Sequence, residues 1–170
     1  YGSVAMFHVE GVTPEAPRAA DLFDGPPQQR ERVGEAEVRA LLGSSGEKFD
    51  EVDVVVFSAP QLSLLEMQAL AALLDGRRVT VPLLAVTSPQ VRPDADRMGL
   101  TARIEASGAT VLSGMCFYQS YAREMAEANG WRRLATNSAK LTNIVGGYGY
   151  RSVLLSAEHC VEAACKGRVP

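Results

Sequence analysis

The chain has 170 residues and a formal net charge of −3, with 46% hydrophobic and 22% charged residues. This length suits one domain with a sizeable core, and the absence of a basic stripe interleaved with aromatics argues against nucleic-acid binding. No apolar run reaches membrane-spanning length, no secretory signal is visible, and three cysteines without short disulfide spacing favour a reducing cytoplasm.

The chain begins at Tyr1 rather than at a methionine, and its first residues read as if they already lie inside a structure. We therefore expect a piece of a longer protein. The first fifty residues also differ in pattern from the rest. The predicted organisation is an N-terminal extension and linker over residues 1–48, followed by an α/β domain over residues 49–170.

Within the extension, "GVTPEAP" (residues 11–17) predicts a turn or a helix start, with Thr13 as a cap and Pro14 at the first helical position. Residues 22–34 combine two prolines with many polar groups and predict a loop or linker. Residues 35–42 predict a short helix.

From about Asp50, strand patterns alternate with helix patterns. A continuous apolar, β-branched run predicts a buried strand at residues 51–59. Further strands are predicted at residues 78–86, 109–114, 132–136 and 150–156. Helix patterns follow these strands at residues 62–76, about 93–108, 117–130, 138–145 and 157–167. Ser63 and Glu66 fit a capping box at the start of the first of these helices. This alternation predicts an α/β fold, with a mostly parallel sheet of about five strands and helices on both faces.

Parallel sheets of this kind bind ligands at the carboxyl ends of their strands, so the loops after the strands are the candidate site. Cys116 lies in one of them, just before a helix. It is interpreted either as a metal ligand or reactive thiol or as a buried structural cysteine. Cys160 and Cys165 lie five residues apart on the last helix, about 140° apart around its axis, and are interpreted as packing residues.

"TNSAK" (residues 136–140) places two hydroxyls, an amide and an ammonium at the mouth of a helix. One interpretation is an anion site, because helix N-termini attract anions and Lys140 adds a point charge. The other is Asn137 or Ser138 as an ordinary N-cap, with Lys140 on a solvated face. His8 and His159 are isolated and are interpreted as ordinary surface or core residues.

Five segments occur in an order and spacing that resemble the aconitase X family: "FHVEGVTPEAP", "APQLSLLEM", "LSGMC", "TNSAK" and "EHCVEAACKGR". The resemblance implies an aconitase-domain-like fold and the later portion of the large catalytic part of a hydro-lyase. Members dehydrate small hydroxy acids, such as cis-3-hydroxy-L-proline or mevalonate 5-phosphate. The implied cofactor is an iron centre, either an iron–sulfur cluster or a single iron, which acts as a Lewis acid. The implied partners are the remaining region of the large part and a small swivelling part, with no nucleic acid and no membrane.

Carried over by position, the resemblance implies a role for eight residues. Cys116 is the metal ligand, and Ser138 and Lys140 are the catalytic residues. The substrate-binding residues are Thr13 and Glu15 of the "TPEA" turn, Ser63, Thr136 and Asn137.

Two family features are missing from this chain. A Pro-His pair commonly follows the first strand, where this chain has Pro60 and Gln61, and a His–Tyr pair commonly follows "TNSAK", where it has Thr142 and Asn143. Either the missing ligands come from the absent region or this member has lost the usual metal site.

The leading interpretation is therefore a segment of a dehydratase, inactive by itself because the site needs at least one other domain. The alternative is a non-catalytic α/β binding or assembly domain derived from the same family. The strand–helix alternation by itself also allows a flavodoxin-like small-molecule binder.

Overall fold

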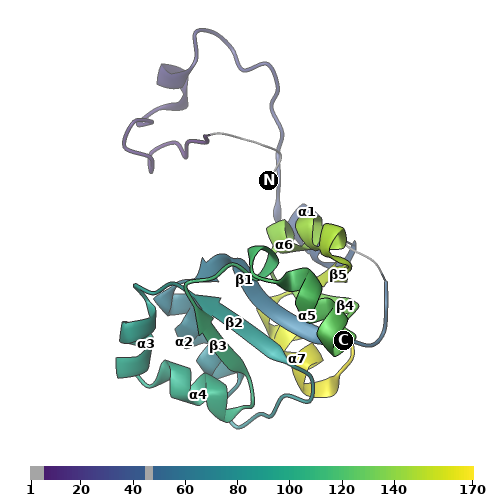
Figure 1. The fold of residues 1–170 in the computed structure, drawn as a ribbon. Helices are drawn as coiled ribbons and strands as arrows, with labels where there is room; N and C mark the ends of the chain where they lie inside the picture. The colour runs from purple at the N-terminus through teal and green to yellow at the C-terminus, as the bar shows by residue number, and fades with distance from the viewer. Residues whose placement is uncertain (1–5, 45–47) are drawn as a thin grey trace. The chain divides into compact units, whose positions relative to one another are not determined.

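The computed structural model in Figure 1 describes residues 6–44 and 48–170. Its contacts divide the chain into two compact units, residues 1–38 and 39–170. The opening residues 1–5, from which a continuation of a longer structure was inferred, lie outside the described part. Each unit is considered by itself.

The described part of the first unit is mainly loop, with one short 3₁₀ helix, η1 (Ala19–Leu22). The segment predicted as a turn or a helix start is a turn. Thr13 Oγ1 accepts a hydrogen bond from the N–H of Val9 at 2.8 Å, and Gly11 N–H donates to the carbonyl of Ala16 at 2.9 Å. The predicted short helix is α1 (Glu35–Ser44), which crosses the boundary between the units.

The second unit contains a five-stranded sheet, which confirms the predicted fold class. Its strands are β1 (Val54–Leu62), β2 (Leu83–Thr87), β3 (Thr110–Ser113), β4 (Arg133–Thr136) and β5 (Arg151–Leu154). They lie in the order β3-β2-β1-β4-β5, and every neighbouring pair is parallel. The longest strand, β1, is therefore also the central one.

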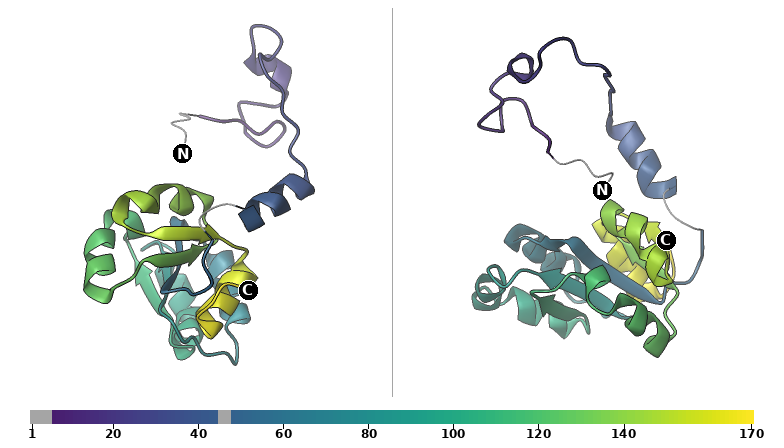
Figure 2. Two further views of the ribbon diagram at one scale, coloured as in Figure 1. Left: turned by 90° about the vertical axis from the view of Figure 1, so that its right-hand side faces the viewer. Right: turned by 45° about the horizontal axis from the view of Figure 1, so that its top comes forward.

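Helices cover both faces of this sheet (Figures 1 and 2). One apolar cluster joins one face to α2 (Leu64–Leu73), α3 (Arg92–Arg97), α4 (Leu100–Ala106) and α7 (Ala157–Lys166). A second cluster joins the opposite face to η2 (Phe117–Gln119), α5 (Ala122–Asn129), α6 (Ala139–Ile144) and η3 (Val145–Tyr148).

Strand β1 contributes to both apolar clusters because successive side chains of a strand point to opposite faces. Val55 and Phe57 belong to the first cluster, while Val54 and Val56 belong to the second. All four side chains are almost completely buried. This explains the continuous apolar run that predicted a strand buried on both faces.

Three elements differ from their predicted bounds. The helix predicted over residues 93–108 is divided into α3 and α4 by Gly99, whose φ of 70° is the left-handed conformation that glycine adopts without strain. Strand β2 begins only after Pro82, because proline has no N–H to donate to a neighbouring strand. The helix predicted from Phe117 starts as η2, and α5 follows from Ala122.

An ion cluster ties β4 to the residues that lead into β1. Arg133 contacts the carboxylates of Asp53 and Glu51, each at 2.6 Å. Burial raises the pKa of Asp53, but hydrogen bonds from the Arg133 side chain and from the backbone N–H groups of Arg132 and Arg133 outweigh it. The pKa of Asp53 consequently lies below its usual value, so the carboxylate form is favoured in the folded state.

Candidate functional site

The strand order creates a topological switch point between β1 and β4. The chain runs from β1 to β2 and β3 on one side of the sheet and then returns to β4 on the other side of β1. In open parallel sheets, a crevice forms at such a point beyond the carboxyl ends of the two strands. Gln61 lies at the carboxyl end of β1, and "TNSAK" begins at the last residue of β4, so these segments share one edge of the sheet.

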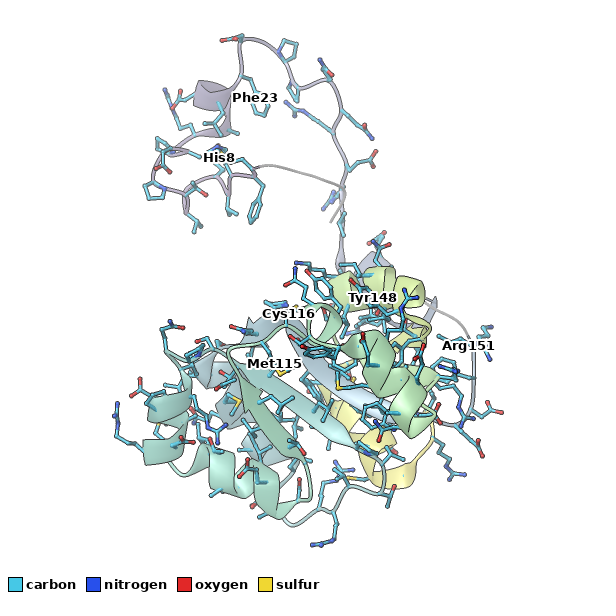
Figure 3. All side chains as sticks on the ribbon, viewed as in Figure 1. His8, Phe23, Met115, Cys116, Tyr148 and Arg151 are labelled. Atoms are coloured by element: carbon cyan, nitrogen blue, oxygen red, sulfur yellow. The ribbon has the colours of Figure 1, made fainter. Side chains whose placement is uncertain are left out.

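Residues 58–61 of β1, here called the β1 end, hold two other loops. Gln61 Nε2 donates to the carbonyl oxygen of Met115 at 2.8 Å. Ser138 Oγ donates to the carbonyl oxygen of Ala59. Through these contacts one stretch of chain connects the loop that contains Cys116 with the loop that contains Ser138. Figure 3 labels Met115 and Cys116 at this edge.

Ser138 is the N-cap of α6, as one of the two interpretations of "TNSAK" predicted. Its hydroxyl accepts from the N–H of Leu141 at 3.1 Å and donates to Ala59. Its own N–H donates to Thr136 Oγ1 at 3.1 Å. Ser138 and Thr136 are both buried. Both hydroxyls therefore have structural partners, and the catalytic role of Ser138 stays a prediction.

Asn137 and Lys140 lie in different surroundings. Asn137 is exposed and lines a small cavity of about 60 Å³ together with residues of α2 such as Glu66 and Leu70. Lys140 is half-buried, and its Nζ lies 5.7 Å from the centre of the Tyr118 ring, within cation–π range. The polar groups of "TNSAK" therefore do not all converge on one point in this chain.

Cys116 is half-buried, with an extended backbone, and packs against the cluster that contains Phe117 and Tyr150. Within residues 6–44 and 48–170, no group of three or more His, Cys, Asp or Glu side chains is placed to hold a metal ion. The donor set therefore does not fit a complete iron site, and Cys116 provides at most one ligand of a shared site.

The other two cysteines agree with their predicted packing role. Cys160 is fully buried on α7, where burial raises the pKa of its thiol far above the usual value. Cys165 is half-buried and packs against the same apolar cluster.

Three further residues were predicted to bind substrate. Thr13 and Glu15 belong to the first unit, where Thr13 stabilises its own turn and Glu15 is exposed. Ser63 forms the predicted capping box. Its hydroxyl accepts from the N–H of Glu66 at 3.3 Å, while the Glu66 carboxylate accepts from the N–H of Ser63 at 2.8 Å.

A larger open cavity, of about 650 Å³, was not predicted from the sequence. It is lined by residues of η2, α5 and η3, among them Tyr118, Tyr121, Arg123 and Tyr148. The rings of Tyr118 and Tyr148 meet edge to face, with centroids 6.2 Å apart, and Figure 3 labels Tyr148 on this face. The sequence signals that could have indicated this cavity are the tyrosines of "FYQSY" and "GGYGY". Because these segments are far apart in the sequence, their contact could not be predicted from it.

None of the helices in the described part of the chain is long and apolar enough to span a membrane.

Comparisons with known proteins were made for the sequence and for the fold. Residues 52–166 match the family model described as the aconitase X third domain. The chain is 39% identical to a cis-3-hydroxy-L-proline dehydratase of Pseudomonas aeruginosa, over 99% of this chain and 30% of that protein. It is 29% identical to a phosphomevalonate dehydratase large subunit of Thermococcus kodakarensis, over 96% of this chain and 40% of that protein.

The fold matches the crystal structure of Thermococcus kodakaraensis aconitase X in its holo-form, with a TM-score of 0.66 and 26% identity. The match covers 78% of this chain and 33% of that one. Because the family model covers most of the second unit and the fold agrees, the chain belongs to the aconitase X family, with residues 52–166 as its third domain.

Proposed function

We propose that this chain is a segment of a hydro-lyase that removes water from a small hydroxy acid. The observation that carries the proposal is the 39% identity, over nearly the whole chain, to a cis-3-hydroxy-L-proline dehydratase. The identity to the phosphomevalonate dehydratase large subunit is lower, at 29%. We therefore place cis-3-hydroxy-L-proline first and mevalonate 5-phosphate second as the substrate.

The chain spans only 30% to 40% of these two relatives. We propose that residues 1–48 connect the α/β domain to the remaining region of a large catalytic part. A small swivelling part is proposed to complete the enzyme. The complete enzyme is proposed to work in the cytoplasm. The isolated 170 residues are expected to be inactive, since the described residues include no metal cluster and their polar groups do not converge.

Within the complete enzyme, Lys140 is proposed to hold the substrate carboxylate. An ammonium acts as a compact point charge for a carboxylate, and Lys140 sits where the strand-end loops meet, above Tyr118. Asn137 is exposed, and its side-chain amide is proposed to bind a carboxylate or hydroxyl of the substrate, whereas Thr136 is buried and accepts from the N–H of Ser138. Glu15, which is exposed on its turn, and Thr13 are proposed as further substrate-binding residues.

An iron centre, as an iron–sulfur cluster or a single iron, is proposed to be shared between domains. Cys116 supplies one thiolate to it, and the other ligands come from the remaining region. When bound, such a centre acts as a Lewis acid toward the departing hydroxyl.

The test uses the complete enzyme that carries this chain, purified without oxygen. We expect release of water from cis-3-hydroxy-L-proline, measured by the absorbance or mass of the product, and slower or no turnover of mevalonate 5-phosphate. Iron content is measured in parallel for the parent enzyme and for Cys116→Ser, with Cys165→Ser as the matched control. Lower iron in Cys116→Ser alone supports the shared centre, whereas equal iron in all three proteins removes Cys116 as a ligand.

The competing function is a non-catalytic binding or assembly domain. The engagement of the Thr13, Ser63 and Ser138 hydroxyls in a turn and two caps favours it, because these groups already have structural partners. A complete enzyme that turns over neither substrate, yet binds its partner part tightly, would establish this function instead.

A further inference from the structure

The loop that carries Cys116, here called the Cys116 loop (residues 114–117), is held by its neighbours on both sides of the cysteine. The carbonyl of Met115, just before it, accepts from Gln61 Nε2 at 2.8 Å. The N–H of Phe117, just after it, makes a longer contact of 3.4 Å with Ser58 Oγ. Both side chains belong to β1, the central strand, which therefore fixes the backbone on both sides of the cysteine.

The Gln61 contact is the stronger of the two because its length is typical of a good N–H···O bond. Its orientation also follows from chemistry. A main-chain carbonyl only accepts, so the amide nitrogen rather than the amide oxygen of Gln61 must face Met115. The Gln61 side chain is half-buried, which limits competition from water.

The end of the Cys116 loop is anchored by packing as well. Phe117 is fully buried and its ring lies 5.7 Å from that of Tyr150, at an angle of 57°. Gly114, at the other end, donates its N–H to the carbonyl of Thr87 at 3.2 Å. Met115 and Cys116, between these anchors, are both only half-buried. Packing does not hold the peptide between Met115 and Cys116. The hydrogen bond from Gln61 therefore fixes this peptide.

We propose that Gln61 is a positioning residue that holds the Cys116 loop, and hence the thiol, in place at the edge of the sheet. Its part in the reaction rests on the function proposed above, in which Cys116 belongs to the site. The amide of Gln61 places an N–H donor at the end of β1, directed at the Met115 carbonyl.

The test measures how fast iodoacetamide alkylates each cysteine of the full chain, read by mass spectrometry of the three cysteine peptides. Gln61→Glu keeps the shape of the side chain but presents an acceptor to the Met115 carbonyl, and Gln61→Met removes the donor without adding charge. Gln61→His retains a ring N–H. Gln68→Glu, on the exposed side of α2, is the matched control for the added charge.

We expect Cys116 to react about fivefold faster in Gln61→Glu and Gln61→Met, the factor that corresponds to one net hydrogen bond. Gln61→His should lie closer to the parent, and Gln68→Glu should not differ from it. Cys165 serves as the half-buried reference, and the fully buried Cys160 reports unfolding. An alkylation rate of Cys116 equal to that of the parent in both Gln61→Glu and Gln61→Met would refute the positioning role. A parallel rise in the alkylation rate of Cys160 would also refute it, because the whole domain would then be unfolding.

Kinetics of the complete enzyme separate this inference from the proposed function. A displaced thiol is expected to lower kcat about tenfold in Gln61→Met with little change in KM, as for a group that acts on the reacting atoms rather than in binding. Faster alkylation of Cys116 with an unchanged kcat would support the positioning role and remove Cys116 from the proposed site.

Discussion

The hydroxyl of Ser138 connects two segments that are 79 residues apart, because it caps helix α6 through Leu141 and donates to the main-chain oxygen of Ala59. One buried side chain thus fixes the start of α6 and ties the loop after β4 to the β1 end. Strands β1 and β4, at the switch point, are thereby also joined beyond the last residues that pair between them in the sheet. The predictions below test this and the other contacts that shape the site.

Ser138→Ala is expected to destabilise the chain by about 2 kcal/mol, since it removes a cap, worth roughly 1 kcal/mol, and leaves the Ala59 carbonyl without its donor. Ser156→Ala is the matched control. Ser156 caps α7 by accepting from His159 N–H at 3.2 Å, and we expect that change to cost about 1 kcal/mol. Urea unfolding followed by circular dichroism gives both values, and equal losses would refute the tether to Ala59.

Asp53→Asn should make the free energy of unfolding less dependent on pH in the acidic range. Because the folded pKa of Asp53 lies below its ordinary value, its ionised form contributes stability above the unfolded pKa, and this contribution disappears as the pH falls through the folded pKa. The variant should therefore be less stable than the parent at pH 7, with the difference shrinking below about pH 4.

Thermal unfolding between pH 7 and pH 3 measures this effect. Asp75→Asn is the control, because Asp75 is 75% exposed and 3.9 Å from Arg103, and such pairs contribute about 0–1 kcal/mol. A gap between Asp53→Asn and the parent that stays constant with pH would contradict the lowered pKa.

Tyr150→Phe should remove a loss of stability at high pH. Burial raises the pKa of Tyr150 to about 12, and its hydroxyl donates to the carbonyl of Ala122 at 2.9 Å. Above about pH 10 the unfolded phenol releases its proton while the folded one keeps it, so stability falls as the pH rises toward the folded pKa.

Tyr150→Phe should be about 1 kcal/mol less stable than the parent at pH 7, because it loses the hydrogen bond to Ala122. This difference in the free energy of unfolding should become smaller between pH 10 and pH 12. Tyr121→Phe, at a side chain that is 75% exposed, should follow the parent at every pH. Denaturant titrations at fixed pH values decide between a narrowing and a constant gap.

Lys140→Met in the complete enzyme is expected to raise the KM for the hydroxy acid by about tenfold or more, with a smaller effect on kcat, if its ammonium holds the substrate carboxylate in both ground and transition states. Lys166→Met is the matched control, since Lys166 pairs with Glu162 on α7. Steady-state kinetics provide the comparison. An unchanged KM in Lys140→Met would assign the ammonium to packing over Tyr118 alone.

Two helix caps near the candidate site could be predicted from the sequence, because neighbouring residues alone determine them. The hydroxyl of Ser63 with a glutamate three residues later predicts a capping box, and Ser138 at the start of an apolar run predicts an N-cap. Both are present. Two elements are shorter than the apolar pattern predicts. The left-handed conformation of Gly99 interrupts one helix, and Pro82, which lacks an N–H, delays the start of β2.

The sequence by itself determined the strand–helix alternation, and hence a parallel sheet covered on both faces, because apolar periodicity reflects which faces are buried. The tertiary structure alone decided which loops meet. Gln61 and Met115 are 54 residues apart, and their contact depends on the strand order that places β1 at the centre. That order follows from the summed packing of two apolar clusters, and no local pattern encodes it.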